Sequence, residues 1–259
     1  MIKYQTEFTN QELSNQVYRI QIDQLEKRNA LNPGVYREIK EGVLRASGCD
    51  DARVILIEGH PGSFAVGGDL KLLLDITKLP PAERTLAYSK AYEEPIPFQS
   101  ILDSPKVVVA KIDGLCLAGG LVLALVADVA IASENATFGV PEGLVGLADP
   151  FCSSLLPLSI GLSRARYLML TAKRIDAATA LDWGMLQQVV SRDALDEATA
   201  ELIADLLKVS PLAQAAYKES SNAFVPHMNS LKVCDVAFTA DGQEGLQAFS
   251  DKRAPIWSA

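Results

Sequence analysis

The sequence predicts an α/β fold in which short buried strands alternate with helices, followed by a largely helical segment. Runs rich in β-branched residues recur along the first half of the chain, and helical patterns separate them. These runs are apolar almost throughout, which favours a sheet buried on both faces. From about Ser163 the pattern of apolar residues changes, and most of the remaining chain has the apolar spacing of amphipathic helices with short breaks.

The individual elements are assigned in chain order from these patterns. Strands are predicted at Val17–Asp23, Arg53–Gly59, Lys106–Gly114 and Asp128–Ser133. Helices are predicted at Val35–Ser47, at about Ala82–Leu102 and in the stretch after Gly119. We therefore expect a βα core over residues 1–190 and a helical segment over residues 191–259, packed on this core or on a neighbouring subunit.

The composition limits the class of function. The 259 residues are 49% hydrophobic and 22% charged, which suits a substantial core and is unlike a disordered chain. The 24 basic and 32 acidic residues give a net charge of −8, so nucleic acid and membrane surfaces are not expected partners. An anionic ligand needs only a local basic cluster, so the net charge does not exclude one.

The sequence favours a cytoplasmic protein without a metal site. The polar N-terminus lacks a signal-peptide pattern, and the longest apolar stretch, Leu115–Ala132, contains Asp128 and two glycines. The four cysteines are scattered and form no CxxC pair, which favours reduced thiols. The only histidines, His60 and His227, lack metal-ligand spacing.

Two glycine pairs interrupt the apolar pattern. Gly67-Gly68 lies between a predicted strand and a helix-like run, and Gly119-Gly120 opens the next apolar helix. Glycines at a helix N-terminus expose backbone N–H groups and let a ligand approach without interference from a Cβ atom. Two such N–H groups that converge on one oxygen form an oxyanion hole. The alternative is that both pairs are tight turns.

Five segments between about Arg19 and Trp257 resemble the crotonase (enoyl-CoA hydratase/isomerase) superfamily in order and spacing. They are KRNALN (Lys27–Asn32), FAVGGDL (Phe64–Leu70), KIDGLCLAGGLVLALVADVAIAS (Lys111–Ser133), TFGVPEGLVGL (Thr137–Leu147) and EGLQAFSDKRAPIW (Glu244–Trp257). The resemblance implies a spiral of ββα units, with the segment 191–259 serving oligomerisation and closure of the CoA pocket. It also implies an acyl-CoA thioester substrate, no cofactor beyond the CoA of that substrate, and a homotrimer or homohexamer.

The resemblance also assigns roles to individual residues. The N–H groups of Gly68 and Gly119 would hold the thioester oxygen while an enolate forms. The two acids used by hydratases fall at Val122 and Glu142, and Val122 and Phe151 would line the acyl pocket. The residues near CoA would be Lys27, Arg28, Ala30, Ala65, Asp69, Leu70, Phe249 and Lys252. Spacing alone favours a surface carboxylate at Glu142, and it is the flanking motifs that favour a catalytic one. The pairs Lys27-Arg28 and Lys252-Arg253 could equally be ordinary solvated charges.

The number of acids decides the expected reaction. A valine cannot activate water, whereas a single base can take a proton from C2 and return it at C4. The pattern therefore resembles monofunctional Δ3,Δ2-enoyl-CoA isomerases, with Glu142 as the proton shuttle. Hydration, hydrolysis and decarboxylation stay open, as does a non-catalytic acyl-CoA-binding subunit. Asp149 departs from the isomerase pattern and is either a second acid/base or nucleophile, or the N-cap of a helix.

Overall fold

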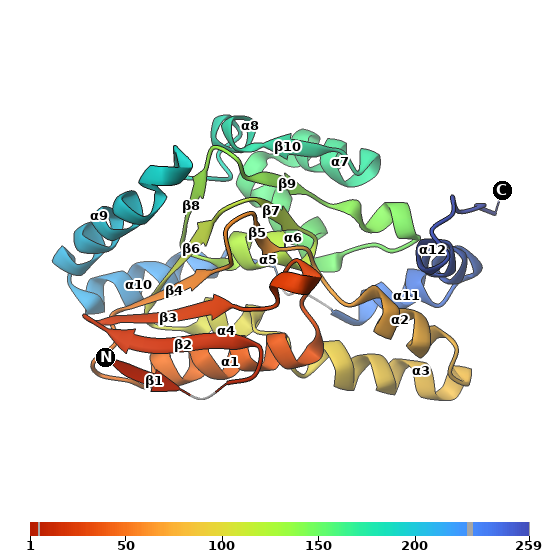
Figure 1. Ribbon diagram of the computed structural model, residues 1–259, viewed down its shortest axis with the longest axis horizontal. Coiled ribbons are helices and arrows are strands. Elements are labelled where there is room, and N and C mark those ends of the chain that lie inside the picture. The colour runs from red at the N-terminus through yellow and green to blue at the C-terminus, as the bar shows by residue number, and fades with distance from the viewer. Residues whose placement is uncertain (5, 227–229, 259) are drawn as a thin grey trace.

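The computed structural model describes residues 1–4, 6–226 and 230–258, and it contains two sheets (Figure 1). The larger sheet has the strand order β1-β2-β3-β4-β6-β8-β11. Its first three strands pair antiparallel, and the strands from β3 to β11 pair parallel. The bounds are β1 (Ile2–Tyr4), β2 (Thr9–Ser14), β3 (Val17–Ile22), β4 (Val54–Glu58), β6 (Val107–Ile112), β8 (Val129–Ser133) and β11 (Gln188–Val190).

A smaller sheet with the order β10-β9-β7-β5 lies beside the large one. Its strands are β5 (Ser63–Ala65), β7 (Leu115–Leu117), β9 (Thr137–Gly139) and β10 (Arg174–Asp176). Each of β4, β6 and β8 in the large sheet is followed by a strand of the small sheet and then by a helical element. The chain therefore winds as a spiral of strand–strand–helix units, as expected from the sequence.

Helices pack around both sheets (Figure 1). The α-helices are α1 (Pro33–Ser47), α2 (Leu70–Thr77), α3 (Pro81–Tyr88), α4 (Phe98–Asp103), α5 (Gly119–Val126), α6 (Pro150–Ile160), α7 (Leu162–Thr171), α8 (Ala177–Asp182), α9 (Leu195–Lys208), α10 (Pro211–Asn222), α11 (Cys234–Ala237) and α12 (Ala240–Ser250). The shorter helical turns are η1 (Leu25–Lys27), the π-helical η2 (Ser89–Glu93), η3 (Pro141–Val145), η4 (Arg192–Ala194) and η5 (Ser230–Val233). Among the described residues, no helix is both long and apolar enough to cross a membrane.

The central strand β4 is buried on both faces, and its side chains divide between two cores. Ile55 and Ile57 belong to the main core, whereas Val54 and Leu56 pack in a second core with residues of α9. This alternation is what a pleated strand produces, because successive side chains point to opposite faces. The segment after residue 190 therefore covers one face of the large sheet.

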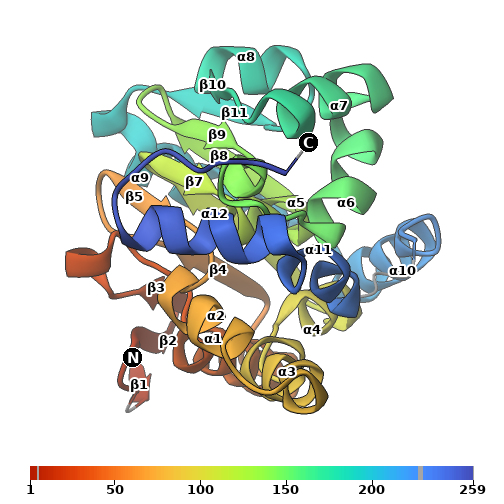
Figure 2. The same ribbon diagram turned by 90° about the vertical axis from the view of Figure 1, so that its right-hand side faces the viewer.

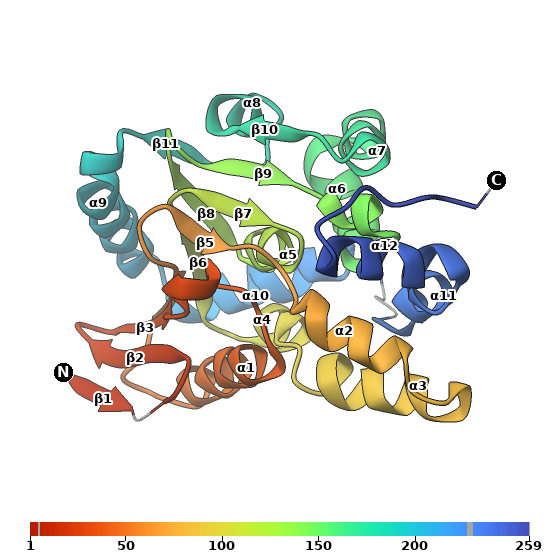
Figure 3. The ribbon, with the colours of Figure 1, turned by 45° about the vertical axis from the view of Figure 1, so that its right-hand side comes forward.

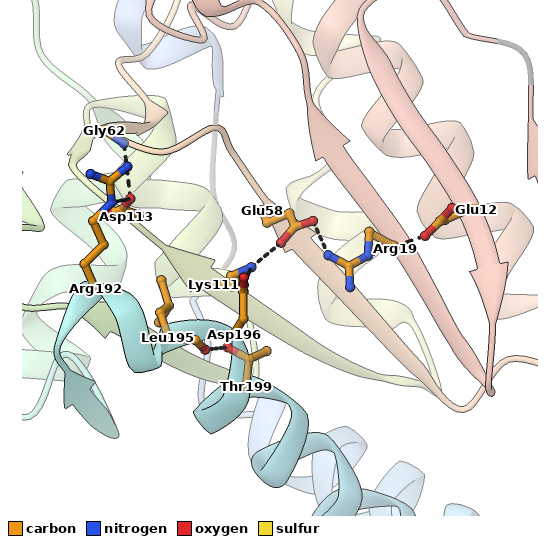
Figure 4. A network of polar contacts seen from close by, with 10 residues as sticks. All are labelled: Glu12, Arg19, Glu58, Gly62, Lys111, Asp113, Arg192, Leu195, Asp196 and Thr199. Atoms are coloured by element: carbon orange, nitrogen blue, oxygen red, sulfur yellow. Dashed lines mark hydrogen bonds and ion pairs between the residues drawn. The ribbon is translucent and has the colours of Figure 1, made fainter.

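A chain of ion pairs ties α9 to the same sheet (Figure 4). Glu58, at the end of β4, contacts Arg19 of β3 and Lys111 of β6, and Lys111 also contacts Asp196 of α9. The Glu58 side chain is only 4% exposed, so two cations compensate a buried charge. The Lys111 ammonium benefits from both carboxylates, and they raise its pKa against the opposing effect of burial.

Most sequence-predicted elements are confirmed, and one is wrong. All four strands and the helix from Val35 are present to within two residues at each end. The single helix expected over about Ala82–Leu102 is wrong, because the chain forms α3, η2 and α4 with a break around Pro95 and Pro97. Proline lacks an N–H donor and disfavours helical geometry in the preceding residue.

Candidate active site

Three loops meet at one edge of the small sheet. Strands β5, β7 and β9 are parallel, so their carboxyl ends lie side by side (Figure 3). The first is followed by Gly67-Gly68, the second by Gly119-Gly120 and the third by the turn η3, which carries Glu142. The spiral thus brings together three motifs that are more than twenty residues apart in sequence.

The two glycine turns touch one another. Gly67 has a positive φ of +94°, and an ideal Cβ there would lie 2.4 Å from the Cβ of Ala118 and 3.3 Å from the backbone nitrogen of Gly119. An ideal Cβ on Gly120 would lie 2.3 Å from the carbonyl oxygen of Ala65. Both positions therefore require glycine, because a side chain would separate the two turns.

The N–H groups of Gly68 and Gly119 lie at or next to the starts of two helices. Gly119 is the first residue of α5, and Gly68 directly precedes Asp69, the N-cap of α2. Within the described part of the chain, neither N–H donates to another residue. Ala118, which precedes Gly119, has φ +54° and ψ −129°, a strained conformation for a non-glycine residue. The chain accepts this strain where α5 begins.

Glu142 is a partly buried residue whose carboxyl group has one buried, unpaired oxygen. It lies in the first turn of η3, and its Oε2 atom is fully buried without a hydrogen-bond partner. Burial raises its pKa well above the usual value, and the nearby charge of Asp149 raises it further. A carboxylate in such surroundings is a stronger base than one in water. The structure thus turns at least one oxygen of the Glu142 carboxyl group away from solvent.

Asp149 is the N-cap of α6 and also a neighbour of Glu142. Its Oδ1 atom accepts hydrogen bonds from the backbone nitrogens of Phe151 (2.7 Å) and Cys152 (2.8 Å). These bonds lower its pKa, but the larger effect of burial leaves the pKa raised. The capping role is therefore present in the structure. A second role in proton transfer remains a prediction, supported by the proximity of the two carboxyl groups.

Aromatic side chains surround these groups. Phe151 packs edge-on against Phe98 with ring centroids 4.8 Å apart, and Phe98 packs edge-on against Tyr36 at 5.9 Å. Tyr92 donates a hydrogen bond to the carbonyl oxygen of Asp69 (2.8 Å). Its ring lies 3.4 Å from the position of an ideal Cβ on Gly68. Val122, one turn into α5, is completely buried.

Sequence reasoning missed the roles of Tyr36, Tyr92 and Phe98. The first lies in a predicted amphipathic helix, where an inward tyrosine looks like any core residue. The other two belong to the segment in which a single helix was wrongly predicted. No local signal distinguishes them, since their placement depends on the path of the whole spiral.

The segment Lys27–Leu31 is held against β5 and the first glycine turn. The Leu31 nitrogen donates to the Gly67 carbonyl (2.7 Å), and the Ser63 hydroxyl donates to the Arg28 carbonyl (2.7 Å). Asn29, which is completely buried, donates to the carbonyl oxygen of Ser63 (2.8 Å). These bonds bring the predicted CoA contacts Lys27, Arg28 and Ala30 alongside Ala65, Asp69 and Leu70.

The remaining predicted CoA contacts lie at the end of α12, which crosses the molecule beside α2 (Figure 2). Phe249 is 57% exposed, and Lys252 is also exposed. In the described residues no hydrogen bond or ion pair joins either one to the segment 27–31. Arg253 differs from Lys252, because its guanidinium forms two bonds to Glu244 (2.6 and 2.9 Å).

The histidines and cysteines are not gathered into a site. No three His, Cys, Asp or Glu side chains among the described residues are arranged to hold a metal ion. His60 pairs with Asp23 at 2.7 Å, and His227 lies outside the described residues. The four cysteines are free thiols, of which Cys116 and Cys152 are buried.

Comparison with known proteins identifies the family. The model of the enoyl-CoA hydratase/isomerase family matches residues 12–259. Over 244 residues the chain is 31% identical to a carnitinyl-CoA dehydratase of Citrobacter koseri, covering 89% of this chain and 91% of that protein.

Solved structures show the same fold. An enoyl-CoA hydratase from Mycobacterium avium subsp. paratuberculosis K-10 matches with a TM-score of 0.83 and 26% identity, over 98% of this chain and 100% of that one. A carnitinyl-CoA hydratase from Mycobacterium avium matches with a TM-score of 0.81 and 26% identity, over 98% and 99% of the two chains. The protein is thus a crotonase-fold enzyme that belongs to the enoyl-CoA hydratase/isomerase family.

Proposed function

We propose that this enzyme moves the double bond of a 3-enoyl-CoA thioester to the 2-position, with Glu142 carrying the proton. The observation that supports this most directly is the Glu142 carboxyl group, whose Oε2 atom is buried without a partner and whose pKa is raised by burial and by the nearby Asp149. The first acid position of two-acid hydratases holds the buried, apolar Val122. One strong base beside an apolar helix suits proton transfer between carbons better than activation of water.

In this mechanism the thioester oxygen accepts hydrogen bonds from the N–H groups of Gly68 and Gly119. The positive end of the α5 dipole favours the negative charge that develops on this oxygen. Glu142 takes a proton from C2, a dienolate forms, and the same carboxyl group returns the proton at C4. No cofactor is needed beyond the CoA of the substrate, whose phosphates would be bound by Lys27, Arg28 and Lys252.

Hydration or dehydration is the second candidate. Two observations favour it: Asp149 places a second carboxyl group beside Glu142, and the relatives include a carnitinyl-CoA dehydratase. Asp149 is already engaged by two backbone N–H groups, so we expect this activity to be the slower one.

Rates measured on matched substrates test the proposal. Isomerisation of 3-hexenoyl-CoA is expected to be faster than hydration of crotonyl-CoA. Replacing Glu142 by Gln keeps the shape but not the base, and it should lower the isomerisation rate by about 10²–10⁴. Fast hydration of crotonyl-CoA by the unmodified protein would defeat the isomerase assignment. Acyl-CoA binding without any turnover would instead indicate a non-catalytic subunit.

A further inference from the structure

The two candidate oxyanion-hole donors are oriented by different means. In a trans peptide the C=O and N–H bonds point in opposite directions, and the described chain contains no cis peptide bond. The carbonyl before Gly119 belongs to Ala118, and it accepts a hydrogen bond from the Val122 nitrogen (3.1 Å) inside α5. The helix itself therefore turns the Gly119 N–H outward from its N-terminus.

The Gly68 N–H depends on a partner from another part of the chain. The carbonyl of the same peptide belongs to Gly67, and it accepts a hydrogen bond from the Leu31 nitrogen (2.7 Å). Among the described residues no other hydrogen bond reaches this carbonyl. Neither glycine has a Cβ atom that would oppose rotation of the peptide between them. The bond from Leu31 is thus what selects one orientation, with the Gly68 N–H pointing away from Leu31.

Leu31 contacts both glycine turns. An isolated parallel β-bridge pairs it with Gly68. Its side chain is completely buried, and the Cδ1 atom lies 3.5 Å from the position of an ideal Cβ on Gly119. A displacement of Leu31 would therefore disturb the turn that supplies one donor and the packing beside the other.

Asn29 holds the chain two residues before Leu31. It is completely buried, and its Nδ2 atom donates to the carbonyl oxygens of Ser63 (2.8 Å) and Phe64 (3.2 Å). Its Oδ1 atom accepts from the Gln24 nitrogen (2.9 Å). Asn29 also has a φ of +57°, which asparagine tolerates better than most residues. The buried amide thus ties the segment to β5, the strand that leads into the first glycine turn.

We propose that Asn29 is a positioning residue for the oxyanion hole and acts through Leu31. Asn29 holds the segment against β5, the Leu31 N–H fixes the Gly67 carbonyl, and the Gly68 N–H is thereby aimed at the thioester oxygen. A donor that is oriented in advance needs no reorganisation when negative charge develops on that oxygen. The inference rests on the proposed oxyanion hole, but not on which of the two candidate reactions predominates.

The carbonyl stretch of a bound thioester tests the inference without relying on turnover. Hydrogen bonds to the thioester oxygen lower the frequency of this stretch, so isotope-edited infrared spectra of butyryl-CoA labelled at the carbonyl carbon report on both donors. Asn29→Gly retains the freedom to adopt a positive φ and should lose about half of the shift seen on binding, because one of two donors is misdirected. The kcat for isomerisation of 3-hexenoyl-CoA should fall about tenfold or more, with KM changed less than about fivefold.

Asn222→Ala is the matched control, because it also removes an amide donor to a backbone carbonyl, that of Leu102 (2.8 Å), but lies on α10. It should lower the thermal midpoint and leave the infrared shift intact. The inference is overturned if Asn29→Gly binds butyryl-CoA with the full shift, or if the unmodified protein binds it with no shift. If the shift is present and depends on Asn29 but isomerisation is absent, the proposed reaction fails and this inference stands.

A backbone substitution tests the central hydrogen bond without removing the buried amide. Replacing the Leu31 N–H by an ester oxygen, through incorporation of the α-hydroxy analogue of leucine, keeps the side chain and removes the donor to Gly67. It should lose the same part of the infrared shift as Asn29→Gly. The same replacement at Val35, whose nitrogen donates to the Asn32 side chain (3.0 Å), should keep the shift. A full shift in the Leu31 ester would overturn the inference, even if Asn29→Gly failed to fold.

Discussion

At the scale of single residues, the raised pKa of Glu142 has a consequence for the stability of the fold. Its raised pKa means that the folded protein favours the protonated form more than the unfolded chain does. Stability is therefore lost as the pH rises from the usual carboxyl value through the raised folded value. Above the raised pKa, the ionised carboxylate, whose buried Oε2 atom has no partner, weakens the structure that holds it.

Glu142→Gln should consequently raise the thermal midpoint while it removes activity. The gain over the unmodified protein should grow with pH, because only the glutamate ionises. Thermal unfolding at about pH 5.5 and about pH 8.5, at equal protein concentration, measures this difference. A gain that is the same at both values, or a loss at the higher one, would show that Glu142 is not held in a charge-disfavouring environment.

Asp149→Asn separates the two roles of that residue. Asparagine still accepts the N-cap hydrogen bonds, so α6 should remain intact. Without the neighbouring charge the Glu142 pKa falls, and the acid limb of the kcat/KM profile for isomerisation should move to lower pH.

The plateau value of kcat/KM in the same pH profile distinguishes a capping role of Asp149 from a role in proton transfer. If Asp149 only caps the helix, the plateau is kept. A loss of about 10²-fold or more at all pH values would mean that Asp149 transfers a proton. Asp149→Ala is the control for lost capping, at a cost of about 1 kcal/mol in stability.

The sequence indicated some residues of the site and not others for a physical reason. Glycine pairs and a Pro-Glu-Gly turn can be recognised in the sequence, because the backbone conformation that they need depends on adjacent residues. Tyr36 and the buried Asn29 leave none, since an inward tyrosine or an asparagine in a loop is common. Their roles arise only when the spiral brings β5, η1 and α5 together.

At the scale of elements, the start of α5 is fitted closely to its surroundings. Gly119→Ala would place a Cβ atom against the Tyr36 hydroxyl, and overpacking of this kind costs about 1–3 kcal/mol. Combining it with Tyr36→Phe should recover part of that loss, because the obstructing oxygen is gone. The free energy of unfolding from denaturant titration of the single and double variants measures the coupling.

Gly120→Ala serves as the comparison for this pair. The Cβ atom of the new alanine would meet the backbone carbonyl oxygen of Ala65, and no substitution can remove a backbone atom. The loss at this position should therefore be the same with and without Tyr36→Phe. Rescue of both alanine variants to the same degree would contradict the described packing at the start of α5.

Elements differ in how far the sequence predicts them. Strand β4 is buried at every position, so its apolar run was unmistakable. The hairpin of β1 and β2 was missed because its inward positions include the polar residues Thr9 and Gln11. The buried Gln11 side chain is satisfied by partners that include the Glu38 carbonyl (2.8 Å), the Tyr18 hydroxyl and the Arg45 guanidinium. Such long-range partners cannot be read from a local pattern.

At the scale of the whole molecule, the proposed CoA ligand is anionic and the protein is acidic, so we expect a few local cations to bind it. Alanine substitution of Lys27, Arg28 or Lys252 should weaken CoA by about tenfold, as expected for one charge-assisted phosphate contact. The affinity should also fall between about 50 and about 300 mM salt, despite the net charge of −8. Titration calorimetry with free CoA measures both effects.

Arg253→Ala provides the contrast, since the Arg253 guanidinium is already bound to Glu244. It should change the CoA affinity less than the other three substitutions. If all four variants kept the CoA affinity of the unmodified protein, these residues would be ordinary surface charges.

The packing of α12 against η3 has a consequence for how the protein folds during its synthesis. An ideal Cβ on Gly245 of α12 would lie 2.4 Å from the Val145 carbonyl, and one on Gly146 would lie 2.3 Å from the Asp241 carbonyl. The helix therefore presses backbone to backbone on the turn that carries Glu142. During translation the glycine loops leave the ribosome long before this helix does. We therefore expect the turn that carries Glu142 to become fixed only after α12 has emerged, so a chain that stops short of this helix should hold its carboxylate less firmly.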